Sequence, residues 1–219
     1  MDELSLRPWM LSLIVASSAT AINVLVGVPM AYLLARRRFP GRSLLEALVI
    51  LPLILPPTVV GFLLMCLIGR SGLLGWLTGQ TLMFSIPAAI IASSVVSFPL
   101  LVMPLRASFA SIQTEFFEEA RIAGITRSNL FFHVALPLAR RGLIVGLLLS
   151  FARGLGEFGA TLILVSTSER TRTLPIQIYI DAGPTNDFLA AWPAVLTLSL
   201  TSIAVILIAN RLRWLDSER

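Results

Sequence analysis

Five long stretches of this chain are apolar and almost free of charge, and they limit the folds open to it. A helix needs about 20 apolar residues to cross a hydrocarbon core of ~30 Å, and it must satisfy its own backbone polar groups there. The expected spans are Met10–Ala35, Ala47–Gly69, Thr81–Leu105, Gly142–Val165 and Ala190–Asn210. The sequence therefore predicts an all-α polytopic membrane protein with five transmembrane helices, in one membrane domain over residues 1–219.

Composition supports a membrane location and argues against a nucleic-acid partner. Hydrophobic residues make up 56% of the chain and charged residues 13%, whereas soluble domains have about 25% charged residues. The isoelectric point near 10.9 is typical of a nucleic-acid binder. However, all 17 basic residues are arginines that fall mainly at the ends of the expected spans. Arginines in these places set membrane topology.

The distribution of arginines predicts the orientation. Five spans place the termini on opposite sides of the membrane. Twelve of the 17 arginines follow the first span, lie between the third and fourth, or follow the fifth. The positive-inside rule assigns these segments to the cytoplasm. We therefore expect the N-terminus outside, the C-terminus in the cytoplasm, segment 109–137 in the cytoplasm, and loop 166–189 outside.

Several function classes are excluded or disfavoured by missing residues. The chain has no lysine, and a phosphate-binding loop of the G-x-x-x-x-G-K-[ST] type needs one to reach the phosphates. The chain is therefore not expected to be an ATPase or another enzyme. Cys66 and His133 are the single cysteine and histidine, so no intrachain disulfide is possible and no metal site is expected.

A polar stretch between the third and fourth expected spans contains residues at the spacing of a known motif. It runs from Glu115 to Gly124 and on to Leu136-Pro137. It resembles the segment by which permease subunits of ATP-binding-cassette (ABC) importers dock on their ATPase, "E-A-A, three residues, G, nine residues, I, one residue, L-P". The matching positions are Glu118, Glu119, Ala120, Gly124, Val134, Leu136 and Pro137. Glu119 replaces the first alanine of the motif and Val134 its isoleucine, without changing the register.

Local chemistry is consistent with two short helices in this segment. Gly124 permits a sharp turn between them, and Thr126 is suited to cap the second helix. Four aromatic residues offer apolar anchors for a protein groove; they are Phe116, Phe117, Phe131 and Phe132. The alternative is a generic cytoplasmic loop whose amphipathic helices lie on the membrane.

Two further segments resemble one branch of these permeases. Leu51-Pro52 with Leu55–Gly61 is similar to the second-span signature of molybdate ABC transporter permeases, and so is Ser150–Thr161 in the fourth span. Thr171–Pro175 follows the same pattern outside the membrane. This resemblance implies import of molybdate or the closely related tungstate. A sulfate/thiosulfate-type ABC permease, or an ion-coupled secondary oxyanion transporter from a different class, are the alternatives.

The same resemblance implies a set of partners. Two copies of the chain would form the pore as a homodimer in the bacterial cell (inner) membrane. Two copies of a cytoplasmic ABC ATPase would bind ATP and Mg, so this chain itself needs no cofactor. An extracytoplasmic molybdate-binding protein would deliver the oxyanion.

Four residues within the spans are candidates for the pathway or its gate. Pro56-Pro57 interrupts the second span, and a proline in a helix interior kinks it; in lipid such a break must be buried in protein or line a cavity. Arg153 and Glu157 lie four residues apart in the fourth span, so they share a helix face and can neutralise one another. This pair either locks helices or a gate together, or Arg153 guides the oxyanion past the midplane.

Overall fold

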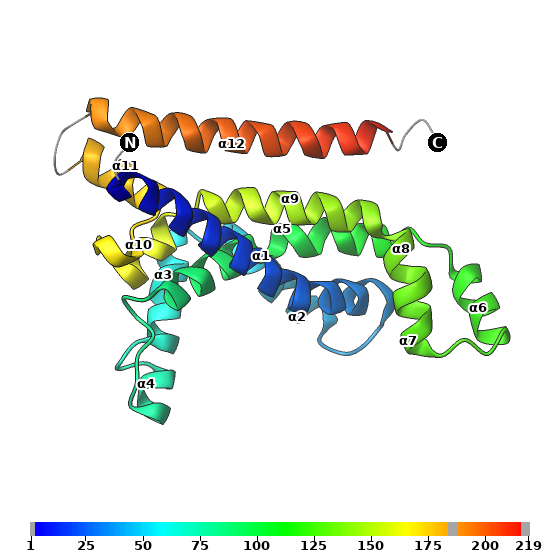
Figure 1. Cartoon of the computed structure of the whole chain (residues 1–219). Coiled ribbons are helices and arrows are strands. Elements are labelled where there is room, and N and C mark those ends of the chain that lie inside the picture. Colours follow the sequence, from blue (N-terminus) through cyan, green and yellow to red (C-terminus); the bar gives the residue numbers. More distant parts are fainter. Residues whose placement is uncertain (1–2, 184–187, 216–219) are drawn as a thin grey trace.

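The apolar stretches form long helices that lie side by side (Figure 1). The structure is a computed structural model that describes residues 3–183 and 188–215, and within them every regular element is helical. The long helices are α1 (Glu3–Arg36), α5 (Ile86–Ala110), α9 (Arg140–Leu155) and α12 (Phe188–Leu215). In Figure 1 the start of α1 and the end of α12 lie at opposite ends of this bundle.

Short helices gather at the two ends of the bundle (Figure 1). One end carries α3 (Pro57–Ile68), α4 (Leu73–Thr78), α10 (Gly159–Val165), η2 (Glu169–Thr171) and α11 (Leu174–Ala182). The other end carries α6 (Thr114–Ile122), α7 (Arg127–Leu130), η1 (Phe131–Ala135) and α8 (Leu136–Leu138). The remaining helix, α2 (Arg42–Ile54), packs against α5.

Helices α1, α5 and α9 pack closely because small residues lie where they meet. A Cβ atom on Gly146 of α9 would come within 2.8 Å of the Leu101 carbonyl oxygen of α5, and one on Gly27 of α1 within 2.6 Å of the Leu101 side chain. Close backbone approach through small residues is the usual basis of helix packing in membranes. The three helices therefore form the closely packed centre of the fold.

In residues 3–183 and 188–215, four helical segments are long and apolar enough to cross a membrane. They are Arg7–Arg36, Pro57–Thr78, Ile86–Ala110 and Phe188–Ile208. A fifth is obtained if Arg127–Leu138 and Arg140–Leu155, which meet at 72°, count as one broken span. The predicted all-helical polytopic fold is confirmed, but two of the predicted spans are built differently from the expectation.

The second predicted span, Ala47–Gly69, is divided between α2 and α3. The division falls at Leu55 and Pro56, whose backbones are extended with ψ values of 143° and 135°. Each of these residues precedes a proline, and the proline ring disfavours the helical conformation of the residue before it. Pro52 lies inside α2 without ending it. The long segment that begins at Pro57 continues into α4.

The fourth predicted span, Gly142–Val165, is also divided. Helix α9 ends at Leu155 and α10 begins at Gly159, so the break contains Glu157. By contrast, the third span is one continuous helix, α5, in spite of Pro99 and Pro104 inside it. It begins at Ile86 rather than near Thr81, because the Ser85 hydroxyl accepts the backbone N–H of Ala88 and caps the helix there.

The expected loop 166–189 contains structure of its own. Helix α11 lies within it, and the N–H of Leu174 donates to the Ser12 hydroxyl of α1 over 2.8 Å. Leu174 and Ile176 are buried. This segment is therefore packed on the bundle; residues 184–187 of the loop lie outside the described residues.

Candidate docking segment and membrane-embedded ion pair

Helix α6 turns one face toward the bundle and the other outward. Phe117 and Ala120 are both buried, at 7% exposure, and residues three apart share a helix face. Glu118 and Glu119 between them are exposed. Within the E-A-A part of the motif, the side chains of Glu118 and Glu119 are therefore exposed, whereas Ala120 packs against the bundle.

The end of α1 holds α6 in place. The Arg36 guanidinium lies 3.8 Å from the centroid of the Phe117 ring, a cation–π contact. The same guanidinium donates from Nη1 to the carbonyl oxygen of Ile112 over 3.1 Å. One arginine side chain therefore connects the last turn of α1 to the chain before and within α6.

Gly124 forms the turn between α6 and α7, as the sequence predicts. Its φ is +72°, and the N–H of Ile125 donates to the carbonyl oxygen of Ala120 over 2.9 Å. A left-handed residue with this backward hydrogen bond is the Schellman ending of a helix. No atom lies within 4 Å of where a Cβ of Gly124 would be, so the requirement for glycine comes from backbone conformation rather than space.

Thr126 caps helix α7 as predicted, because its hydroxyl accepts the N–H of Asn129. The aromatic residues then divide into two groups. Phe131 stacks edge-on with Tyr32 of α1 at a centroid distance of 4.9 Å, and Phe117 is buried as described. Phe116 and Phe132 are exposed, at 47% and 58%. Two of the four expected anchors thus hold the segment to its own bundle, and two remain available on the surface.

The docking motif ends where the chain turns back into the bundle. Leu136 is half-buried and Pro137 is exposed. The 72° bend before α9 follows directly. In Figure 1 the helices α6, α7 and α8 lie at the same end of the molecule, so the fold brings the motif residues to one end.

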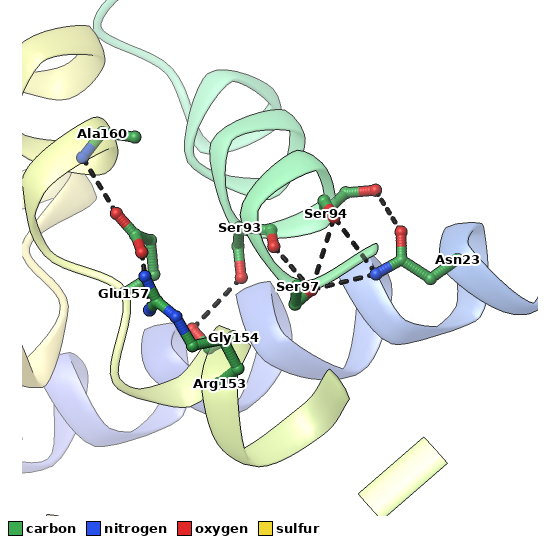
Figure 2. Close-up of polar contacts among 8 residues, drawn as sticks. All are labelled: Asn23, Ser93, Ser94, Ser97, Arg153, Gly154, Glu157 and Ala160. Atoms are coloured by element: carbon green, nitrogen blue, oxygen red, sulfur yellow. Dashed lines mark hydrogen bonds and ion pairs between the residues drawn. The ribbon is translucent and has the colours of Figure 1, made fainter. Parts of the chain in front are cut away.

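Arg153 and Glu157 form an ion pair across the break between α9 and α10 (Figure 2). Arg153 Nη1 lies 2.7 Å from Glu157 Oε2. The other carboxylate oxygen, Oε1, accepts the backbone N–H of Ala160 over 2.8 Å, in the first turn of α10. Arg153 lies in the last turn of α9, so each charge lies at the helix end whose dipole favours it. The Glu157 side chain is 1% exposed and that of Arg153 28%.

The two helix breaks lie beside one another. A Cβ on Gly159, at the start of α10, would come within 2.9 Å of Pro57 Cβ, at the start of α3. One turn further along, a Cβ on Gly61 would come within 2.8 Å of the Ala160 backbone. The structure therefore brings Pro57 close to the segment that holds Glu157, although they are a hundred residues apart in sequence. Pro56 is exposed.

A buried polar cluster escaped the sequence analysis. Asn23 of α1 has no exposed surface, and its Nδ2 donates to Ser97 Oγ over 2.9 Å and to Ser150 Oγ over 3.0 Å. Its Oδ1 accepts from Ser94 Oγ over 2.6 Å (Figure 2). The cluster links α1, α5 and α9. A lone asparagine in the middle of an uncharged span was the signal that could have revealed it.

The helical fold resembles that of the permease subunits of ABC importers. The chain belongs to the family described as binding-protein-dependent transport system inner membrane component, whose model matches residues 24–215. It is thus a multi-pass inner-membrane protein. Within the described residues, no three histidine, cysteine, aspartate or glutamate side chains gather as a metal site would require.

Individual relatives show which members of this family the chain is similar to. The chain is 40% identical to the molybdenum transport system permease protein ModB of Escherichia coli (strain K12), over 96% of this chain and 94% of that protein. It is 41% identical to ModB of Haemophilus influenzae, over 77% of this chain and 76% of that protein. Among solved structures, the inward-facing MetNI methionine ABC transporter matches with a TM-score of 0.74 at 18% identity, over 97% of this chain and 98% of the matched one. The predicted family is confirmed.

Proposed function

We propose that this chain is the pore-forming subunit of an ATP-driven importer for molybdate or the closely related tungstate, acting as a homodimer. The substrate assignment rests on one observation: the chain is 40% identical, over 96% of its length, to a molybdenum transport permease. The match to an ABC permease fold over nearly the whole chain supports the transport class. In this assignment residues 1–219 are one permease domain, and an extracytoplasmic molybdate-binding protein supplies the oxyanion.

The proposed docking site for the ATPase is the segment 109–137. Glu118 and Glu119 are exposed on α6 and Pro137 is exposed after α7. Ala120, Leu136 and Gly124 shape the segment, because the first two face the bundle and the third makes the turn. Two copies of the cytoplasmic ATPase, which hold ATP and Mg, would bind here. Movement of the ATPases would then be transmitted to α1 through Arg36 and to α9 through the bend after Leu138.

The proposed gate lies where the two helix breaks meet. Pro56 and Pro57 begin one broken segment, and Arg153 and Glu157 bridge the other. Both oxygens of the Glu157 carboxylate are already engaged, one by Arg153 and one by the Ala160 N–H. This supports a role for the pair in holding α9 and α10 together. The alternative, in which Arg153 binds the oxyanion through its other guanidinium N–H groups, predicts full assembly without uptake when both charges are removed.

The proposed orientation has the N-terminus outside and the docking segment in the cytoplasm. It rests on the arginine distribution and on the need for a cytosolic ATPase to reach α6 to α8. The loop 166–189, with α11, would then face the binding protein.

Uptake by the reconstituted complex tests the proposed function. Proteoliposomes containing the permease and its cognate ATPase are supplied with the binding protein loaded with molybdate, tungstate or sulfate, and accumulated oxyanion is measured. We expect ATP-dependent uptake of molybdate and tungstate and little of sulfate. Uptake without ATP, driven by an ion gradient, or preference for sulfate would contradict the assignment. An ATPase with its phosphate-binding lysine replaced serves as the control.

A further inference from the structure

A pocket of about 260 Å³ lies between the end of α1, helix α6 and helix α7. Its apolar lining includes the buried side chains of Phe117 and Leu130. Its polar lining includes Arg36, Arg37 and Arg127, with Glu118 as the carboxylate. The pocket therefore combines an aromatic and aliphatic interior with an excess of positive charge.

Two of these three arginines, Arg37 and Arg127, are available to bind an anionic ligand. Arg36 is engaged with the Phe117 ring and the Ile112 carbonyl. Arg37 and Arg127 are exposed, and neither side chain forms an ion pair with another side chain in the described part of the chain. An anion in the pocket would meet both without breaking an existing ion pair.

The depth of the pocket in the membrane points to the kind of anion. Arg36 and Arg37 come immediately after the uncharged run that ends at Ala35, so they lie where the hydrocarbon core gives way to the head groups. Tyr32, which also lines the pocket, is of the type enriched at this level. Basic pockets between membrane helices at such a position suit phospholipid head groups.

We propose that this pocket binds an anionic phospholipid, with its phosphate between Arg37 and Arg127 and the start of its acyl chains against the apolar lining. An acidic segment of a protein would satisfy the arginines but leave the aromatic interior unused. Part of the pocket lining comes from the segment 109–137 proposed for ATPase docking, but of the motif residues named there only Glu118 lines the pocket. The lipid would lie between α1 and α6, where its presence would set the position of the docking segment. The proposal depends on membrane location and not on the substrate or the ATPase.

Lipid retention by the full-length permease tests the site. Wild-type protein in neutral detergent is titrated with dioleoyl phosphatidylglycerol, and bound lipid is counted by native mass spectrometry. The double variant Arg37→Gln/Arg127→Gln is compared with Arg38→Gln/Arg140→Gln, which removes the same charge from exposed positions at the same end outside the pocket. Size-exclusion chromatography checks folding, and Arg127→Gln alone replaces the double variant if the latter misfolds.

We expect the pocket variant to bind phosphatidylglycerol about 30-fold more weakly, because each basic residue near an anionic lipid contributes a factor of about five. The control variant should retain most of its affinity. Equal losses in both variants, or no loss in either, would overturn the proposal. So would competition by inorganic phosphate as effective as the lipid, or release of the lipid when the ATPase is added, since the latter would assign the pocket to protein docking.

Discussion

Glu157 is held on both of its carboxylate oxygens, by Arg153 Nη1 at 2.7 Å and by the N–H of Ala160 at 2.8 Å. One side chain thus neutralises a charge at the end of α9 and caps the beginning of α10. The two residues differ in burial, because the Glu157 side chain is 1% exposed and the Arg153 side chain 28%. This difference makes the two halves of the pair unequal under mutation.

Removing Arg153 should therefore destabilise the protein more than removing the charge of Glu157. Arg153→Met leaves a buried carboxylate without its counter-ion, a loss of roughly 3–5 kcal/mol for buried pairs. Glu157→Gln keeps an oxygen for the Ala160 N–H and leaves an arginine that is partly exposed. The double variant should recover much of the lost stability. The measurement is the midpoint temperature of unfolding in detergent for all three variants.

Uptake by the same variants separates a clasp from an oxyanion ligand. A clasp predicts that the double variant regains both assembly and part of its uptake. Full assembly with no uptake would assign Arg153 to the pathway instead. Equal destabilisation by the two single variants would contradict the prediction that the more buried Glu157 makes the loss of Arg153 more costly.

ATPase association should depend on Gly124 because this left-handed glycine lies in the proposed docking segment. A left-handed glycine elsewhere in the chain should not affect the association. Gly124→Val strains a left-handed residue by about 1–2 kcal/mol. Gly41, with a φ of +86° and equally open space, provides the matched control in the loop between α1 and α2. We expect Gly124→Val to reduce copurification of the ATPase several-fold and Gly41→Val to leave it intact. Equal losses would show that general strain, and not the docking turn, is responsible.

Asn23 should contribute more to stability than an ordinary polar residue of its helix. Asn23→Leu leaves the hydroxyls of Ser97 and Ser150 without their donor, at a cost of about 1–2 kcal/mol. Thr20→Val removes a hydroxyl that bonds only to Ala16 of the same helix and should cost less than half as much. Thermal unfolding in detergent compares the two. A smaller effect for Asn23→Leu would indicate that the cluster does not hold α1 to α5 and α9.

Cysteine accessibility should place Ser128 and Ser168 on opposite faces of the membrane. Both are exposed, and single cysteines at these positions can be introduced after Cys66→Ser removes the native thiol. A membrane-impermeant maleimide added to intact spheroplasts should label position 168 and not 128, with the pattern reversed in inside-out vesicles. Labelling of both from one side would refute the orientation derived from the arginines.

The sequence predicted the helical class, the turn at Gly124 and the helix cap at Thr126 because each depends on local chemistry. A left-handed turn and a helix cap are set by one or two residues. The arrangement of the breaks was harder to foresee. Pro52, Pro99 and Pro104 lie inside continuous helices, whereas Pro56-Pro57 ends one because two consecutive residues precede a proline.

Contacts that depend on where each helix ends could not be predicted from the sequence. Glu157 could be paired with Arg153 from spacing, but its bond to the Ala160 N–H depends on α9 ending at Leu155. The burial of Phe117 beneath Arg36 likewise depends on α1 ending beside α6. The contact between Arg36 and Phe117 has no local signature, because its partners come from elements that meet only in the folded chain. The bond between Glu157 and Ala160 is local in sequence, but it forms only where the helix breaks.

We propose that arrival of the substrate drives ATP hydrolysis through α6. The most direct test is molybdate-stimulated ATP hydrolysis by the reconstituted complex, comparing wild-type permease with Glu118→Arg and with Arg38→Glu. Arg38 is exposed and lies outside both the segment 109–137 and the loop 166–189, so it provides the matched charge reversal. We predict that loaded binding protein stimulates hydrolysis with wild-type and Arg38→Glu permease and not with Glu118→Arg. Undiminished stimulation with Glu118→Arg would contradict the account.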